Sequence, residues 1–148
     1  MTFDENSVRS RIQLIAGYLA EMNLLRGMDS EEIFNDVFKY RAVERLHELI
    51  IQASIDVNRH CLGELYGIAP TTNADVFVQA AKVGILPPDL AIKLAEASKF
   101  RNFLAHQYER IDPFVVIENI ESICIDFQRY LDCLENYVSS LQDNDTEI

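Results

Sequence analysis

The sequence predicts an all-α protein: a single domain over residues 1–148, folded as a bundle of four to five main helices. Apolar residues recur at helical spacing along most of the chain, which favours amphipathic helices. Turn-forming residues are rare, with 5 Gly and 4 Pro in 148 residues, whereas a β-sandwich needs frequent turns. The hydrophobic share of 49 % is sufficient for a buried core without disulfides or metal ions.

The N-terminal part of the chain predicts two helices separated by Gly27. The first begins at Asn6 or Ser7, with Ser7 as its cap, and ends near Gly27, where glycine permits a left-handed turn. Its apolar seam consists of Val8, Ile12, Ile15, Leu19 and Met22. Asp29 caps a second, short helix, whose apolar face consists of Ile33, Phe34, Val37 and Phe38.

The middle of the chain predicts a long helix followed by a shorter one. The long helix opens with the segment Tyr40–Leu46 and ends near Gly67. Its buried face consists of Leu46, Leu49, Ile50, Ala53, Val57, Cys61 and Leu65. After a loop over 70–73, the shorter helix carries Val76, Phe77, Ala80 and Val83, and Gly84 closes it.

The C-terminal part predicts two further helices. The first starts at Pro88 and runs to about Ala105, because proline suits the first helical position. The second starts at Asp112 and Pro113, and its seam consists of Ile117, Ile120, Cys124, Phe127, Leu131, Leu134, Val138 and Leu141. We expect this seam to pack inside the bundle rather than against a second copy, and the polar tail over 142–148 to fray.

The charge balance is acidic, with 24 Asp and Glu against 13 Lys and Arg and a formal net charge of -11. Such a chain repels polyanions at long range, so any contact with RNA has to be local. The three cysteines show no paired spacing and the three histidines no metal-binding motif. We therefore expect a cytoplasmic protein with reduced thiols and without a metal ion or cofactor. No apolar run reaches about 18 residues and no signal peptide is evident, which predicts no membrane segment.

The stretch over 98–112 departs from the pattern of a plain helical bundle. In the helical turns before it, the apolar seam consists of Leu90, Leu94 and Ala97. The next residue on this seam is Arg101. A guanidinium in that place must be paired or must face a cleft, because an unpaired buried charge is very costly. His106 and Tyr108 follow within the same stretch. Arginine fits a phosphate, histidine moves protons near neutral pH, and tyrosine orients a group or stacks on a base.

These residue types suit metal-independent cleavage of RNA. The ribose 2′-hydroxyl is the nucleophile, His106 is the general acid or base, and Arg101 stabilises the developing charge, which gives a 2′,3′-cyclic phosphate. On one straight helix these two side chains point apart. Either the helix ends near His106, or a second copy across a two-fold axis completes the site. A structural alternative pairs Arg101 with Glu44, Glu96 or Asp112 and leaves His106 to cap the helix end.

The octet Arg101-Asn102-Phe103-Leu104-Ala105-His106-Gln107-Tyr108 matches the R-x4-H-x-Y motif of the HepT-like toxins within the HEPN superfamily. Three further segments are similar to the family's long-helix start, motif-helix start and post-motif turn; they are Tyr40–Leu46, Pro87–Ala91 and Ile111–Asp112. The resemblance therefore extends over roughly residues 8 to 140, which makes it more specific than the short motif alone.

The resemblance implies a helical bundle that dimerises and brings two motifs into one cleft. It implies an RNase toxin of a two-gene toxin–antitoxin module, with Arg101 and His106 as the catalytic pair and Asn102 as a helper. The implied partner is an MntA-type minimal nucleotidyltransferase, which neutralises the toxin by transferring AMP to Tyr108. The alternative is a non-catalytic HEPN module that pairs with a nucleotidyltransferase and binds a nucleotide or RNA without cutting it.

Basic residues near the motif are candidates for contact with RNA, namely Lys99, Arg110, Lys93 and Arg41. We expect them to line the rim of the cleft and to offset the acidic surface locally. AMP on Tyr108 would add a phosphate beside Arg101, where it would occupy the place of the scissile phosphate.

Overall fold

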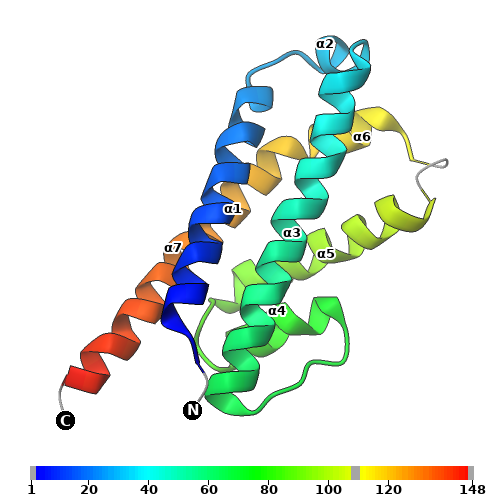
Figure 1. The fold of residues 1–148 in the computed structure, drawn as a ribbon. Helices are drawn as coiled ribbons and strands as arrows, with labels where there is room; N and C mark the ends of the chain where they lie inside the picture. The colour runs from blue at the N-terminus through cyan, green and yellow to red at the C-terminus, as the bar shows by residue number, and fades with distance from the viewer. Residues whose placement is uncertain (1–2, 108–110, 147–148) are drawn as a thin grey trace.

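The computed structural model confirms an all-α bundle (Figure 1). It describes residues 3–107 and 111–146, apart from the side chains of 105–107 and 142–146. The helices of this part are α1 (Glu5–Arg26), α2 (Ser30–Phe34), α3 (Val37–Tyr66), α4 (Asn73–Lys82), α5 (Pro88–Gln107), α6 (Pro113–Glu118) and α7 (Ile120–Thr146). Because α2 and α6 are short, the bundle is built from the remaining long helices, as predicted.

The long helices surround one core. Helix α1 packs against both α3 and α7, whereas α5 packs against α3, α4 and α7 (Figure 1). The seam predicted for the last helix is buried except at its final residue; the buried members are Ile117, Ile120, Cys124, Phe127, Leu131, Leu134 and Val138. Its expected role inside the bundle is therefore confirmed. The backbone of α7 remains helical to Thr146, through most of the tail that we expected to fray.

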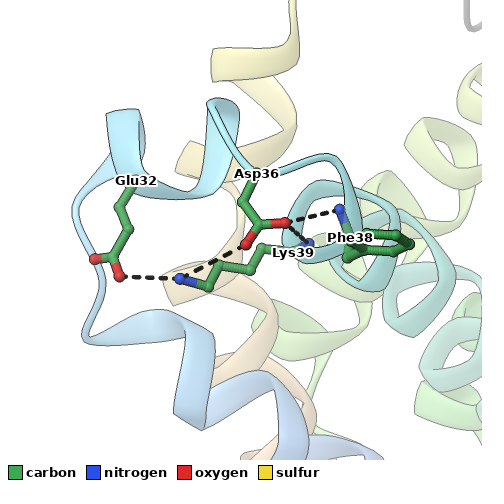
Figure 2. A network of polar contacts seen from close by, with 4 residues as sticks. All are labelled: Glu32, Asp36, Phe38 and Lys39. Atoms are coloured by element: carbon green, nitrogen blue, oxygen red, sulfur yellow. Dashed lines mark hydrogen bonds and ion pairs between the residues drawn. The ribbon is translucent and has the colours of Figure 1, made fainter.

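Asp36 caps the start of α3, and an ion pair joins this first turn to α2 (Figure 2). The Asp36 carboxylate accepts hydrogen bonds from the backbone N–H groups of Phe38 and Lys39, at 3.0 and 3.3 Å. The Lys39 ammonium lies 3.0 Å from Glu32 of α2 and 3.9 Å from Asp36. The cap satisfies donors that the first helical turn leaves free, whereas partly exposed ion pairs contribute less.

Two predictions about the ends of α1 were wrong. Its cap is Asp4 rather than Ser7, because the helix begins earlier, and the Asp4 carboxylate accepts a hydrogen bond from the Ser7 backbone at 3.1 Å. Gly27 does end the helix, but with φ -83° it keeps a right-handed conformation instead of a left-handed one. Left-handed glycines close α3 at Gly67, with φ 66°, and follow α4 at Gly84, with φ 88°.

The predicted apolar face of α2 is only partly buried. Ile33 is buried, but Phe34, Val37 and Phe38 are exposed, with Phe38 at 82 %. The physical reason is the break at Asp36: α3 starts in a new direction at Val37, so its first residues do not continue the buried side of α2. Phe34 instead stacks on Phe114 of α6, with ring centroids 4.8 Å apart.

The single helix predicted from Pro113 onward is divided in two at Asn119. The Asn119 side-chain amide donates to the Val115 carbonyl at 2.8 Å, and the Asn119 backbone N–H donates to the same carbonyl at 3.2 Å. Helix α7 then starts with its own bond from Ile123 N–H to the Asn119 carbonyl at 3.0 Å. Asparagine side chains compete with helical backbone bonds, and this competition explains the break that an apolar seam cannot reveal.

The two helix-ending glycines respond differently to alanine. We expect Gly67→Ala to lower the free energy of unfolding by about 1 kcal/mol, because its positive φ is unfavourable for a residue with a Cβ. Gly27→Ala is the matched control: its φ is negative and no atom lies within 4 Å of an added Cβ, so stability should stay equal or rise. Urea titration of both variants measures this, and equal losses would contradict the left-handed assignment.

Candidate functional site

The motif predicted from the sequence lies at the C-terminal end of α5. Helix α5 ends at Gln107, so the backbone at His106 is still helical and the helix ends just after it. This position agrees with one of the two solutions that the helical geometry left open. The side chain of His106 lies outside the described part of the structure, and so do Tyr108 and Arg110 altogether.

Arg101 is partly buried on the side of α5 that faces the bundle, and its buried Nε has no hydrogen-bond partner among the described groups. Its Nη1 donates to the Asn102 Oδ1 at 3.3 Å. Among the described residues no carboxylate lies within ion-pair distance of the guanidinium. The structural alternative is therefore wrong for the three carboxylates that it named.

Each of those three carboxylates is placed elsewhere. Glu44 pairs with Arg41 of the same helix at 2.5 Å, and Asp112 caps α6 by accepting from the Phe114 backbone at 3.0 Å. Glu96 lies in a groove between α5 and α7. None of the three named carboxylates therefore neutralises the Arg101 guanidinium.

The first turns of α3 lie close to Asp112, the residue that caps α6. Burial and the Glu44 carboxylate raise the pKa of the Tyr40 phenol, Arg41 lowers it, and Asp112 raises it further. Arg41 also lies over the Tyr40 ring, 5.9 Å from its centroid. The segment that resembles the family's long-helix start therefore lies close to the N-cap residue of α6, Asp112.

The basic residues proposed for RNA contact are distributed over several surfaces. Lys93 lines the groove between α5 and α7, of about 550 Å³, together with Glu96 and Asp126. Lys99 is exposed on another side of α5, since positions 93 and 99 lie about 120° apart around an ideal helix. Arg41 is exposed and paired on α3. Within the described part, the structure brings Asn102 into contact with Arg101.

Sequence reasoning missed His47, a fully buried residue of α3 at 0 % exposure. Its ring lies edge-on to Phe100, the residue before Arg101, with ring centroids 6.1 Å apart. Neither ring nitrogen makes a hydrogen bond of ordinary geometry to a described group. Burial lowers the pKa of His47 to about 4, and the Val116 backbone of α6 acts in the opposite direction. An unpartnered buried polar group costs about 1–3 kcal/mol, so this side chain calls for an explanation.

The low pKa of His47 predicts a loss of stability in acid. The folded protein holds the ring neutral down to about pH 4, whereas the unfolded chain takes up the proton near 6.5. The stability present above pH 6.5 is therefore lost as the pH falls from 6.5 to 4, by about 3 kcal/mol at most. We expect His47→Leu to flatten this part of the curve, as urea titrations at pH 7 and 4.5 will show. Equal slopes in both proteins would contradict the assignment.

The remaining candidate groups are apolar in character. Cys61 and Cys124 are buried and Cys133 is partly buried, as expected of small hydrophobes, and burial raises the pKa of each thiol, that of Cys61 to about 11. In the part of the chain that the structure describes, no three His, Cys, Asp or Glu side chains are grouped to hold a metal ion. No helix among the described residues is long and apolar enough to cross a membrane.

The fold is shared with solved structures of HEPN toxins. A toxin–antitoxin complex with AMP-PNP contains a chain with a TM-score of 0.79, 18 % identity, and coverage of 87 % of this chain and 97 % of that one. A tri-AMPylated HEPN toxin from Shewanella oneidensis, in complex with an MNT antitoxin, gives 0.79 at 19 % identity, with 87 % and 96 % covered. The cytosolic protein YutE from Bacillus subtilis, of unknown function, gives 0.74 at 16 % identity, with 89 % and 91 % covered.

The sequence is related to ribonucleases of one family. The family described as Ribonuclease HepT-like matches residues 11–134. A protein named tRNA nuclease HepT from Aphanizomenon flos-aquae (strain 2012/KM1/D3) is 31 % identical over 136 residues, which are 92 % of each chain. The chain therefore belongs to the HepT-like ribonuclease family, which confirms the resemblance found in the motif.

Proposed function

We propose that this chain is the ribonuclease toxin of a toxin–antitoxin pair, and that tRNA is the first substrate to test. The observation that carries the proposal is Arg101, a partly buried arginine without a described carboxylate partner, beside Asn102 and five residues before His106. A charge held in this way needs an anion, and a phosphodiester supplies one. Family membership supports ribonuclease chemistry, and the name of the cyanobacterial relative suggests the class of RNA.

The proposed reaction needs no protein nucleophile. The ribose 2′-oxygen attacks the adjacent phosphorus and loses its proton to a base, the bond from phosphorus to the 5′-oxygen breaks, and the leaving oxygen takes up a proton. The products are a 2′,3′-cyclic phosphate and a 5′-hydroxyl. His106 moves these protons, while Arg101 stabilises the negative charge on the phosphate, with Asn102 holding the guanidinium in place.

The proposed assembly has two further parts. A second copy of the chain brings another motif into the same cleft, because Arg101 and His106 point apart on one helix. A minimal nucleotidyltransferase serves as antitoxin, by analogy with the antitoxin complexes of similar fold. The acidic net charge of -11 suits a basic surface on that partner better than it suits RNA in general.

Incubation of the purified protein with a tRNA pool, in the presence of EDTA, tests the activity. We expect cleavage with 2′,3′-cyclic phosphate ends, unchanged by the chelator, and about 10²-fold or greater loss in His106→Ala. RNA binding without cleavage would instead favour the non-catalytic HEPN module. Loss of cleavage in EDTA that Mg²⁺ restores would exclude the proposed metal-independent reaction.

Transfer of AMP to Tyr108 should silence the enzyme. In the proposed step the Tyr108 oxygen attacks the α-phosphorus of ATP on the nucleotidyltransferase, and pyrophosphate leaves. The new phosphodiester places a negative charge beside Arg101, so we expect cleavage to fall to background. Mass spectrometry of the protein co-expressed with the nucleotidyltransferase measures the modification, and Tyr108→Phe is the control. Full neutralisation with an unmodified Tyr108 peptide would contradict this mechanism.

A further inference from the structure

His47 connects α3 to both sides of the motif. Its ring lies against Phe100 on α5, immediately before Arg101, and close to the backbone of Val116 on α6. The positions 100 and 116 bracket the whole motif and the turn that follows it. The buried His47 side chain therefore lies near the chain just before the motif, at Phe100, and shortly after it, at Val116.

Packing alone does not account for a histidine in this place. The side chain is fully buried and neither ring nitrogen has a hydrogen-bond partner of ordinary geometry among the described groups. Leucine would fill a similar volume without burying an unpartnered polar group. Burial lowers the pKa of the His47 ring and the Val116 backbone raises it, and no charged group among the described residues affects it. His47 is therefore not there as a partner in an ion pair.

The unpartnered polar atoms of the described core point to the same region. The buried side-chain nitrogens without a partner belong to His47, Asn58 and Arg101. Asn58 still accepts a hydrogen bond from Tyr130 at 3.0 Å, deeper in the bundle. The other two residues lie on the two helices that Phe100 joins. The polar atoms that the fold leaves unsatisfied thus concentrate beside the motif.

We infer that His47 is a positioning residue for Arg101: its ring, held between Phe100 and the Val116 backbone, fixes the rotation of α5 at which the guanidinium faces the substrate phosphate. The inference rests on the proposed ribonuclease activity. Phe100 and Arg101 are consecutive, so a rotation of α5 that moves the Phe100 ring also moves the guanidinium. The Val116 contact, in addition, fixes the spacing between α5 and α6.

Two variants of His47 separate positioning from packing. His47→Leu keeps the volume and removes both nitrogens, whereas His47→Gln restores a polar group that reaches toward the Val116 backbone. We expect His47→Leu to lower kcat for RNA cleavage by at least about tenfold with an unchanged KM, since small misplacements of catalytic groups cost that much or more. His47→Gln should recover part of the loss. Thermal stability at pH 7 should be equal or higher in His47→Leu.

Hydrogen exchange of the backbone provides a readout that does not depend on activity. We expect His47→Leu to accelerate exchange over residues 100–104 and 114–118, because α5 and α6 lose their common contact. Ser54→Ala is the matched control: it removes another buried polar group of α3, whose hydroxyl only bonds the Ile50 carbonyl at 2.8 Å. It should leave both segments and kcat unchanged. Phe100→Leu should reproduce the kcat loss, and the double variant with His47→Leu should add little.

The outcomes distinguish the inference from the proposed function. If the wild-type protein cleaves RNA and His47→Leu cleaves equally well with unchanged exchange, the positioning role is wrong and the activity stands. If the wild-type protein does not cleave RNA, the proposed function fails, and exchange alone decides whether His47 holds α5 and α6 together. If stability, kcat and KM fall by similar amounts in His47→Leu and Ser54→Ala, His47 only contributes to packing and the positioning role is wrong.

Discussion

Arg101→Ala is expected to abolish RNA cleavage while it leaves the fold intact. In the proposed mechanism Arg101 faces the scissile phosphate, and removal of a preorganised charge donor lowers kcat by about 10²- to 10³-fold or more. The free energy of unfolding should change by less than about 1 kcal/mol. The reason is structural: Arg101 forms no ion pair with a described carboxylate, and its Nε is buried without a partner. Cleavage assays and urea titration of the same preparation measure both effects.

Arg129→Ala provides the matched control for this result. Arg129 forms an exposed ion pair with Asp89 at 3.3 Å, across the interface of α5 and α7. Loss of an exposed pair costs little, so stability and cleavage should both remain close to the wild type. If Arg101→Ala instead unfolded the protein at room temperature while keeping residual activity, the arginine would be structural. Growth of cells that express each variant without the antitoxin repeats the comparison in vivo.

Phe77→Ala is expected to have the largest effect on stability, about 3–5 kcal/mol. Phe77 of α4 is fully buried, and its ring meets Tyr130 of α7 edge-on at 6.4 Å. Removal of the ring leaves a cavity beside the Tyr130 ring, and the surrounding helices close it only in part. A loss of this size is a large fraction of the about 5–15 kcal/mol that stabilise a typical domain, so the thermal midpoint should fall by about 10–20 °C.

The same substitution at Phe38 serves as the control, since Phe38 is 82 % exposed at the start of α3. Phe38→Ala should change the free energy of unfolding by less than about 0.5 kcal/mol. Circular dichroism during thermal unfolding gives both values. Similar losses of unfolding free energy at the two positions would show that Phe38 is buried in solution, for example against a second copy of the chain.

The order and burial of the helices followed from the sequence because each seam repeats at helical spacing. What could not be predicted depends on single polar side chains. Asn119 breaks the last seam with a side-chain bond that leaves the apolar pattern intact, and Asp36 redirects the chain before Val37 by capping a new helix. Hydrophobic periodicity predicts neither break, because it reports which residues are buried. It does not report which side chains compete for the hydrogen bonds of the helix backbone.

The candidate site, too, could be predicted only in part from the sequence. Arg101 was visible as a charge on an apolar seam, but the absence of a described carboxylate partner depends on how α3, α5 and α6 meet. His47 was overlooked because it appears in the sequence as an isolated histidine on a long helix. Its burial depends on Phe100 and Val116, which lie far along the chain, so only the assembled bundle reveals it.

Because Arg101 has no carboxylate partner among the described residues, we can predict how the gene would change if its activity were no longer selected. If Arg101→Ala is as mild for stability as expected above, folding constrains position 101 weakly, whereas it constrains the fully buried Phe77 strongly. In a copy whose activity is no longer selected, substitutions at position 101 would accumulate without unfolding the protein, and those at position 77 would be removed. An arginine retained at position 101 would then be explained by the proposed chemistry and not by the stability of the bundle.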